Sequence, residues 1–458
     1  MQWNRAAGRW RRIGALWARR IGRRLCHRLW REQSGSTLVL FAFALPAALG
    51  MGAIGVETGL WYVSKRSIQT QADAGALGGA FAKVWGQSDA QANAAALKEA
   101  QRNGYDGGSL EKIDPNIPPQ FGPYKGESSA VEVMIYRQHN TMLFAALVPD
   151  DLLTISTRAV AGVVPTGKAC ILALNELQTQ ALKNSGNTTV SAPKCAIASN
   201  STDDAAAYFT GSADIEVQTV WTPGDMQLQG TKVKLVTSDP PTTKKWPLED
   251  PFAGTPINIP LGACSSGNWT GAATKSPGKY CGGITVNSSA VINLMPGTYY
   301  IDQGNLQVNG GATVKCTSCS PGGAGVTFVL TSSGSVNNIG TVQLNGSATV
   351  TLNAPAEGVA SAGPGGIYEG LLFYQDPRAP KDTSRTGQLN GGATTSLVGA
   401  TYFPANNVTW NGNLTGASEC TLIIADTVTL TGSSTLSADK CDEFKIKSAV
   451  TTKVALIE

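Results

Sequence analysis

The sequence is short of histidine and of charged residues. Only 2 of its 458 residues are histidine and 15% are charged, where about a quarter is usual. A zinc site built on Cys316 and Cys319 would need two more ligands, and His27 and His139 are the only histidines. No glycine-rich phosphate loop occurs either. These shortages count against a metal- or nucleotide-dependent enzyme, and we expect no cofactor.

Glycine, by contrast, is abundant, with 52 residues. Together with many Ser, Thr and Asn residues it favours turns and an extended β architecture. The net charge of +4 is the sum of two different regions. Residues 1–34 hold ten arginines and one acid, Glu32, and therefore carry a charge of +9. The rest of the chain carries 4 − 9 = −5. A nucleic-acid partner would need a basic patch on a folded surface, so none is expected.

An uncharged run of twenty residues extends from Thr37 to Val56. At about 1.5 Å per residue it spans roughly 30 Å, the thickness of a bilayer's hydrocarbon core. Arginines precede it, and Trp61 and Tyr62 follow it, so we expect a single-pass bacterial inner-membrane helix with a cytoplasmic N-terminus. A cleaved signal peptide is the alternative, although the run is longer than a signal core. Processing after Gly35, as in prepilins, stays open, but Leu40 stands where those substrates carry glutamate.

Several residues give this span a particular character. Pro46 is expected to kink it. Gly52, Gly55 and Gly59 put small residues near one side, which lets another helix approach closely in lipid. Glu57 lies at the outer edge, where an ionisable side chain indicates either a protein partner or a position among the headgroups. We therefore expect the bilayer and other membrane proteins as partners.

The stretch Gly35–Ala80 carries a recognisable pattern: a helix with a proline, an acidic residue that closes the span, and a Q-x-x-A-D-A-A-A-L-A-G-A type signature. The matching residues are Pro46, Glu57, Gln69, Ala72, Asp73, Ala74, Ala76, Leu77, Gly79 and Ala80. The pattern resembles the N-terminal module of TadG-like (TadE/TadG-like) proteins of Flp, or tight-adherence (Tad), pilus-assembly systems. Glu57 replaces the family's usual aspartate, and Gly75 and Gly78 replace alanine.

This resemblance implies an inner-membrane protein linked to pilus assembly, surface attachment or secretion. Some TadG-like proteins also carry a von Willebrand A domain with a D-x-S-x-S metal site. The nearest string here, Asp382–Thr386, follows Arg-Ala-Pro-Lys instead of an apolar strand. We therefore expect no such domain and no metal site.

Residues 64–165 are predicted to form a small α+β neck. Apolar residues at helical spacing predict a helix that continues from the membrane, a break at Gly86–Asp89, and a second helix over Ala90–Asn103. Strands are expected at Val131–Arg137 and Leu152–Val164, with a short helix at Thr141–Leu147 between them.

Beyond Thr166 short alternating runs are separated by Asn-Gly, Gly-Gly and Ser-Gly. Similar pieces begin at Asn309, Asn345, Asn390 and Thr431, spaced 36, 45 and 41 residues apart. Irregular repeats of strands and turns favour a right-handed parallel β-helix, or solenoid; a β-sandwich or jelly roll is the alternative. The expected segments are a basic tail (1–34), a transmembrane helix (35–63), the neck (64–165), a first solenoid portion (166–239), a Pro-rich insertion (240–283), a second solenoid portion (284–445) and a C-terminal tail (446–458).

Nine cysteines are present, of which Cys26 lies before the membrane span. An even number in the exported part indicates disulfides in an oxidising compartment. Eight cysteines allow 105 pairings, and we favour nearest neighbours. The expected pairs are Cys170–Cys195, Cys264–Cys281, Cys316–Cys319 and Cys420–Cys441. A redox role for Cys316 and Cys319 stays open, but a redox motif favours the start of a helix, and Ser320-Pro-Gly-Gly follows.

Catalytic candidates are few. A β-helix enzyme acting on polysaccharide would use paired carboxylates. Asp376, Asp382, Asp426 and Asp439 are candidates for such a cleft, but no pair stands out. We therefore predict a non-enzymatic, membrane-anchored structural or adhesive component of a Tad/Flp-type pilus system, with a surface or polysaccharide ligand. The alternatives are a polysaccharide-acting enzyme and an envelope scaffold or sensor with an arginine-rich tail.

Overall fold

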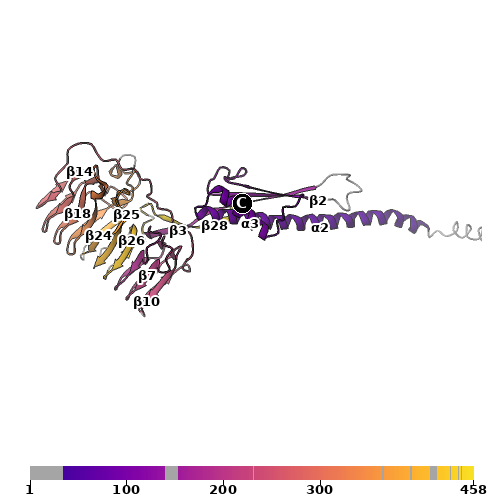
Figure 1. Ribbon diagram of the computed structural model, residues 1–458, viewed down its shortest axis with the longest axis horizontal. Coiled ribbons are helices and arrows are strands. Elements are labelled where there is room, and N and C mark those ends of the chain that lie inside the picture. Colours follow the sequence, from indigo (N-terminus) through magenta and orange to yellow (C-terminus); the bar gives the residue numbers. More distant parts are fainter. Residues whose placement is uncertain are drawn as a thin grey trace, which may run out of the picture. The chain divides into compact units, whose positions relative to one another are not determined.

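The structure is a computed structural model that describes residues 35–139, 153–230, 232–363, 366–391, 395–412, 420–433, 435–441, 443–444 and 446–458. The arginine-rich tail, with Cys26 and His27, and the helix expected at Thr141–Leu147 lie outside the described residues. The chain is mainly β, with one long apolar N-terminal helix and a second, small helix (Figure 1). It divides into an N-terminal unit (Met1–Gly162 with Ala455–Glu458) and a β unit (Val163–Val454).

The N-terminal unit begins with helix α2, Gly35–Val84, which is assigned without interruption through Pro46. Gly86 then adopts a φ of 73°, a left-handed conformation that glycine tolerates and that ends the helix. Helix α3, Asp89–Arg102, follows the break. Its capping box joins the Ser88 side chain to the Gln91 backbone and the Gln91 side chain to the Ser88 backbone, which satisfies two amides that helix geometry leaves unpaired.

The helices accompany an antiparallel sheet of β1 (Glu111–Asn116), β2 (Val131–His139) and β3 (Leu153–Ala173). Strand β3 passes beyond its expected end through Pro165. Its ladder with β2 ends at Ala161, and its ladder with β6 starts at Lys168. Pro165, which has no N–H to donate, therefore lies between these two ladders.

The C-terminal residues, expected as a tail, include a strand instead. Strand β28 covers Ala449–Leu456. At its end the Ile457 N–H donates to the Val160 carbonyl, and the Val160 N–H donates to the Glu458 carbonyl. The alternation of AVTTKVALI suits such a paired strand. The last residues of the chain are thus held beside β3 in the N-terminal unit.

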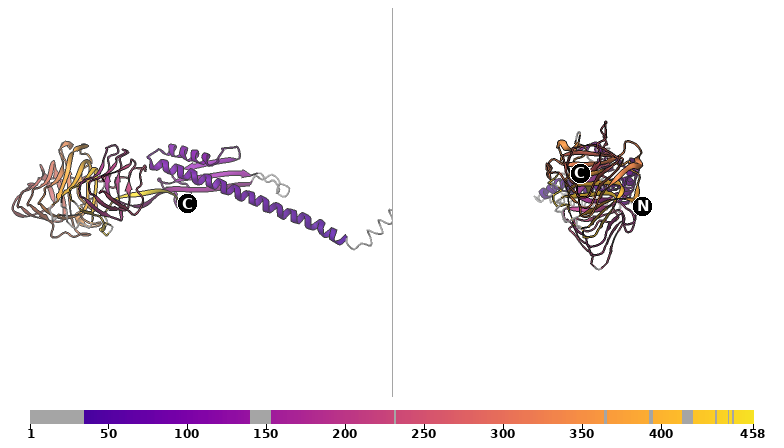
Figure 2. Two further views of the ribbon diagram at one scale, coloured as in Figure 1. Left: turned by 90° about the horizontal axis from the view of Figure 1, so that it is seen from below. Right: turned by 90° about the vertical axis from the view of Figure 1, so that its left-hand side faces the viewer.

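In the β unit the strands pair in parallel and form three ladders, in which neighbouring strands lie side by side (Figure 2). The first ladder contains, in spatial order, β14 (Gly278–Cys281), β17 (Gly297–Asp302), β20 (Val326–Thr331), β23 (Leu371–Gln375), β25 (Ser396–Gly412), β26 (Thr421–Thr431), β3, β6 (Cys195–Ser199) and β9 (Val220–Trp221). The second contains β12 (Asn268–Trp269), β15 (Ile284–Val286), β18 (Gly304–Val308), β21 (Ile339–Leu344), β24 (Asp382–Gly391), β25, β26, β4 (Leu182–Asn184), β7 (Ala207–Thr210) and β10 (Met226–Gln229).

The third ladder is assigned in two pieces. One contains β13 (Ala272–Lys275), β16 (Val291–Leu294), β19 (Thr313–Lys315), β22 (Thr349–Asn353) and the start of β25. The other contains β27 (Thr435–Ser437), β5 (Thr189–Ala192), β8 (Asp214–Val217) and β11 (Lys234–Thr237). Short 3-10 turns lie at η2 (Val336–Asn338) and η3 (Ala360–Ala362). Because the antiparallel strands of the N-terminal unit join the larger sheet through β3, that sheet is mixed, and it does not close on itself.

Chain order and spatial order differ in the ladders. Strand β26, near the C-terminus, pairs with β3 and β4, where the β unit begins. The ladders therefore run from β12–β14 through β26 to β3–β5 and end at β9–β11. In addition, residues 268–281, expected within the Pro-rich insertion, form β12, β13 and β14. The connection without named strands is correspondingly shorter than expected.

We call residues 240–267 the Pro-rich strap. Near its start Thr242 makes a parallel bridge to Trp221, and near its end Ser265 makes one to Tyr280. These partners lie at opposite ends of the first ladder. The strap therefore connects one end of the first ladder to the other. The strands of residues 268–437 start at that far end, and their order along the ladder leads to the strands of residues 168–237.

Tyrosine side chains of the first ladder fasten the strap. Tyr402 donates its hydroxyl to Asp250 Oδ2 at 2.7 Å, and Tyr374 donates to the Thr255 carbonyl at 3.1 Å. Burial raises the pKa of both tyrosines above the usual value, so the hydroxyls remain protonated donors. The Phe252 ring also packs edge-on against Tyr402, with ring centroids 5.4 Å apart.

Aromatic rings fill the interior at one end of the stack. Trp269 and Tyr280 lie edge to face at 5.4 Å, and Tyr280 stacks on Tyr299 at 6.0 Å. Tyr299, Phe328 and Phe373 follow at the same register of successive strands, at 5.3 and 5.9 Å. Such spacings suit favourable ring pairs, and parallel pairing produces them by aligning equivalent positions.

One column of turns requires glycine. Gly432, Gly186, Gly211 and Gly230 all have positive φ, between 77° and 108°. A Cβ on Gly186 would lie 2.9 Å from the Gly432 nitrogen, and one on Gly211 would lie 2.6 Å from the Gly186 oxygen. Backbone conformation and close approach of adjacent turns thus both exclude a side chain.

Four disulfides are present in the structure: Cys170–Cys195, Cys264–Cys281, Cys316–Cys319 and Cys420–Cys441. The first links neighbouring strands β3 and β6. The second ties the end of the strap to β14. Each of these two therefore reinforces a place where the chain enters the first ladder.

Candidate functional site

The first half of α2 is apolar and exposed. Helix residues Leu38–Val84 contain an 18-residue window of mean hydropathy 2.1, none of it buried within the protein. Leu38 and Phe43 expose 75% and 77% of their surface. By length and composition this is the one candidate membrane span among the described residues. An apolar surface of this kind is stable in lipid and costly in water, so the helix suits a membrane anchor.

Glu57 behaves differently from its neighbours in the helix. Val56 and Leu60 expose 58% and 52% of their surface, whereas Glu57 exposes only 3% and has an interaction partner within the protein. This carboxyl group is therefore enclosed by protein. Whether Glu57 also meets a partner protein or the headgroups stays a prediction.

The second half of α2 packs on the rest of the unit. Ile68, Ala72, Ala76 and Ala80 are fully buried, at the spacing of one helix face. On α3 the facing residues are Ala92, Ala96 and Ala100, also fully buried. Small side chains on both helices permit close approach, which explains in physical terms the alanine and glycine content of the signature.

Gly75 and Gly79 lie at the closest contacts. A Cβ on Gly75 would lie 3.1 Å from the Ala96 carbonyl oxygen, and one on Gly79 would lie 2.7 Å from Val131 Cγ1 and 3.3 Å from the Ala92 oxygen. Neither backbone oxygen can move without shifting α3. Gly75, a departure from the family pattern, therefore has a structural reason in this chain.

We expect Gly79→Val to destabilise the N-terminal unit by about 1–3 kcal/mol, the usual cost of overpacking. Gly50→Val is the matched control, because a Cβ at Gly50 meets nothing within 4 Å. Hydrogen exchange of α3 and β2 in the full-length, detergent-solubilised protein measures the effect. Equal protection of both variants would contradict the packing explanation.

The polar signature residues make contacts within the unit. Gln69 donates from Nε2 to Asp73 Oδ1 at 2.7 Å and to the Arg158 carbonyl at 3.2 Å. The second bond ties α2 to strand β3. Gln69, with Asp73 as its second acceptor, thus holds the helix on its own sheet.

Arg158 is the centre of a buried ionic cluster. Its guanidinium bonds to Glu132, to Glu458 and to the Phe121 carbonyl. The bonds to Glu458 and then to Glu132 raise the pKa of Arg158, while its partial burial opposes them. The Glu132 side chain is fully buried and also accepts the Gln120 N–H at 3.0 Å. The cluster therefore joins β2, β3, the loop after β1 and the C-terminus.

A second polar seam lies between α2 and the sheet. Arg137 bonds to Glu111 and reaches Gln71 Oε1 at 3.5 Å. The Nε2 atom of His139 lies 2.5 Å from Ser64 Oγ. Both contacts position α2, and among the residues that the structure describes no third group is seen to orient His139 as a catalytic base.

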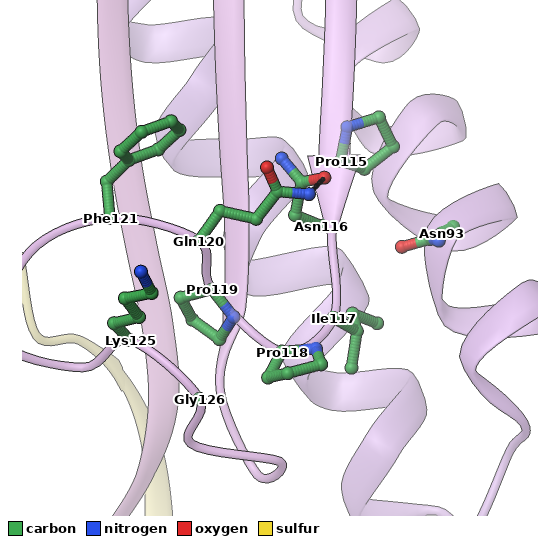
Figure 3. Close-up of a pocket in the computed structure, with 10 residues that line it drawn as sticks. All are labelled: Asn93, Pro115, Asn116, Ile117, Pro118, Pro119, Gln120, Phe121, Lys125 and Gly126. Carbon is green, nitrogen blue, oxygen red and sulfur yellow. Dashed lines mark hydrogen bonds between the residues drawn. The ribbon is translucent and has the colours of Figure 1, made fainter.

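A pocket of about 650 Å³ lies between α3 and the loop that follows β1. Its walls come from Pro118, Pro119 and Phe121 on the loop and from Asn93 on α3 (Figure 3). The Asn93 Oδ1 atom is buried without a hydrogen-bond partner in the described residues, and the Phe121 side chain is 54% exposed. No sequence motif pointed to this pocket, although nine of its ten lining residues fall within residues 115–126.

The four acids considered for a catalytic cleft have separate environments. Asp376 is fully buried and is held by Arg378 at 2.6 Å. Asp426, 1% exposed, accepts Asn175 Nδ2 at 3.0 Å. Asp382 accepts the Ser384 hydroxyl, and Asp439 is exposed. No group of three or more potential metal-ligating side chains occurs in the described part of the chain.

These features define a membrane-anchored protein with a small helix-and-sheet unit and a large, mainly β unit. Residues 35–85 match the model of a family described as "Putative Flp pilus-assembly TadE/G-like". The chain therefore carries a TadE/G-like module, and the resemblance predicted for its N-terminal region is confirmed. The match supports a Tad-pilus-associated role. No curated protein and no solved structure matches the chain.

Proposed function

We propose that this protein is a structural and adhesive component of a Tad-type pilus system. The observation that carries the proposal is the TadE/G-like match at residues 35–85, on a helix whose first half is apolar and exposed. The ten arginines before the helix favour a cytoplasmic N-terminus by the positive-inside rule. The β unit then lies on the far side of the inner membrane, where its disulfides are stable.

The β unit, in this proposal, is a parallel β-solenoid that presents a repetitive surface. Support comes from the parallel pairing within the three ladders described above, from the aligned interior aromatic rings and from the column of positive-φ glycines. In a solenoid each coil contacts only its neighbours, so the ends need protection. The Pro-rich strap, bridged to both ends of the first ladder, supplies part of it.

An enzymatic role has less support. A glycosidase pair needs carboxyl groups about 5–10 Å apart around the scissile bond. Asp376 is held by a cation and Asp426 by an amide donor below the surface, where both are engaged within the protein. The arginine-rich tail of the scaffold or sensor alternative lies outside the described residues.

A complementation experiment tests the proposal. We expect deletion of the gene to lower surface attachment and the number of surface pili, and the wild-type gene to restore both. A chain with Leu49→Arg and Ile54→Arg should restore neither, because each arginine at a membrane helix centre costs about 2.5–3.5 kcal/mol. Its loss from alkaline-washed membranes checks the anchor directly.

Leu177→Arg is the matched control, since Leu177 is 80% exposed in the β unit. This variant should stay in the membrane and restore both properties. Normal attachment and normal pilus number in the deletion strain would contradict the proposed function. Retention of the doubly substituted chain in washed membranes would contradict the anchor.

A further inference from the structure

A second pocket, of about 500 Å³, lies in the β unit where strands of the first ladder turn into those of the second. Its lining residues include Asp302, Gln303, Asn305, Asn337, Asn338 and Arg385. We call it the polar corner pocket. Nothing in the sequence repeats pointed to it.

Unequal turn lengths create the pocket. The turn between β14 and β15 is Gly282–Gly283, and that between β17 and β18 is the single residue Gln303. In the next coil, residues 332–338 separate β20 from β21. Two short turns therefore form a floor, and the longer turn beside them, with Arg385 of β24, forms a wall.

The floor is polar and firmly held. Asp302, 1% exposed, accepts the Ser333 N–H at 2.7 Å and its hydroxyl at 2.6 Å, and pairs with Lys279 at 3.1 Å. Burial by itself would raise the pKa of Asp302, but these donors outweigh it and the pKa lies below its usual value. Asp302 is therefore ionised and neutralised by Lys279.

Several carboxamides on the pocket have unused hydrogen-bonding atoms. Asn305 uses Oδ1 to accept the Thr341 N–H at 2.9 Å, and Gln303 uses Oε1 to accept Asn338 Nδ2 at 3.3 Å. Among the described residues nothing bonds to Asn305 Nδ2, to Gln303 Nε2 or to the side-chain carboxamide of Asn337. Gln303 also has a φ of 63°, a strained conformation for a residue with a side chain, and such strain is often found at functional sites.

Arg385 adds a cation to the wall. Its Nη2 donates to the Ile339 carbonyl at 2.8 Å, which fixes the guanidinium without neutralising it. No ion pair of Arg385 with an acid occurs in the described part of the β unit. With Asp302 already paired to Lys279, Arg385 is the cation of the lining, and Asp382 on the same strand is close enough for the Arg385 charge to help lower its pKa.

We propose that the polar corner pocket binds an acidic saccharide, a sugar chain that carries carboxylates. Carboxamides donate to and accept from hydroxyl groups, and a fixed guanidinium binds a carboxylate through charge-assisted bonds. The lining has no aromatic residue, which disfavours a flat apolar ligand. This inference rests on the proposed adhesive function and names the chemical class of its ligand.

Calorimetric titration of the full-length protein in detergent micelles tests it, with trigalacturonate and the uncharged maltotriose as probes. We expect trigalacturonate to bind and maltotriose to bind more weakly. Arg385→Met should weaken trigalacturonate binding by about tenfold or more, the usual effect of losing a charged hydrogen bond. Asn337→Ala, in an exposed turn, should weaken both sugars without affecting the fold.

Lys315→Met is the matched control, since it removes one charge from an exposed position on the third ladder and should leave binding unchanged. No binding of trigalacturonate by the wild-type protein, or wild-type affinity for trigalacturonate in both the Arg385→Met and the Asn337→Ala variants, would overturn the inference. Pilus number in cells separates this inference from the proposed function. The Arg385→Met variant should produce a normal number of pili, whereas a deletion strain with a normal number of pili would contradict the proposed function.

Discussion

Arg158→Met is expected to cost the N-terminal unit about 3–5 kcal/mol, because it leaves the Glu132 carboxylate buried without its cation. The Glu132 side chain has no exposed surface, so water cannot replace the lost partner. The same substitution also frees Glu458 and the Phe121 carbonyl. Hydrogen exchange of β2 and of the C-terminal residues should report the loss in both places.

A double variant separates the charge from the packing. In Arg158→Met with Glu132→Gln no buried charge remains, and the glutamine can still accept the Gln120 N–H, so most of the lost stability should return. Arg102→Met is the surface control: Arg102 pairs with Glu99 on α3 and is 61% exposed. Equal stability of the Arg158 and Arg102 single variants would contradict the importance of the buried cluster.

Phe252→Ala should detach the Pro-rich strap and destabilise the β unit by about 3–5 kcal/mol, the range for truncating a buried aromatic residue. Phe252 is 2% exposed, packs on Tyr402 and lies under the Lys447 ammonium at 5.8 Å. Its loss leaves a cavity between strap and ladder. Limited proteolysis of the native protein, with cleavage sites located by mass spectrometry, should show new cuts within residues 240–267.

The strap itself contains the matched control. Leu261 has a relative exposure of 103%, so Leu261→Ala removes an aliphatic side chain that packs on nothing. It should change neither the cleavage pattern nor the thermal unfolding of the β unit. If the strap is cleaved equally slowly in the wild type and in both variants, then Phe252 does not hold the strap on the ladder.

Several features of the N-terminal region could be predicted because they depend on local sequence. The break between the two helices follows from Gly86, which ends the first, and from Ser88 and Gln91, which cap the second. The strand at Val131–Arg137 follows from strict alternation and extends only to His139. The TadE/G-like pattern could be recognised for the same reason, because it lies in one continuous stretch of sequence.

Other expectations failed where distant pairing decides the outcome. The three strands within residues 268–281 are short and lie among prolines and glycines, so their sequence does not predict them. Their strand conformation depends on pairing with β15, β16 and β17. The C-terminal residues looked like a tail because their partner, Val160, lies almost three hundred positions earlier. Neither the Arg158 cluster nor the polar corner pocket has a sequence signature, since both gather residues from separate elements.

The sequence by itself therefore determined an apolar helix next to a basic tail, a TadE/G-like module and a β-rich, cysteine-containing remainder. Composition, periodicity and continuous motifs are local properties of the chain. They are enough to predict membrane insertion and turn formation, because neither depends on contacts with distant residues. Only the tertiary structure decided the order of the ladders, in which β26 pairs with β3 and a strap returns the chain to the far end. Parallel strands of similar composition can pair in many orders. In the order found here the aromatic rings are buried, and the strap contacts Tyr374 and Tyr402 of the first ladder.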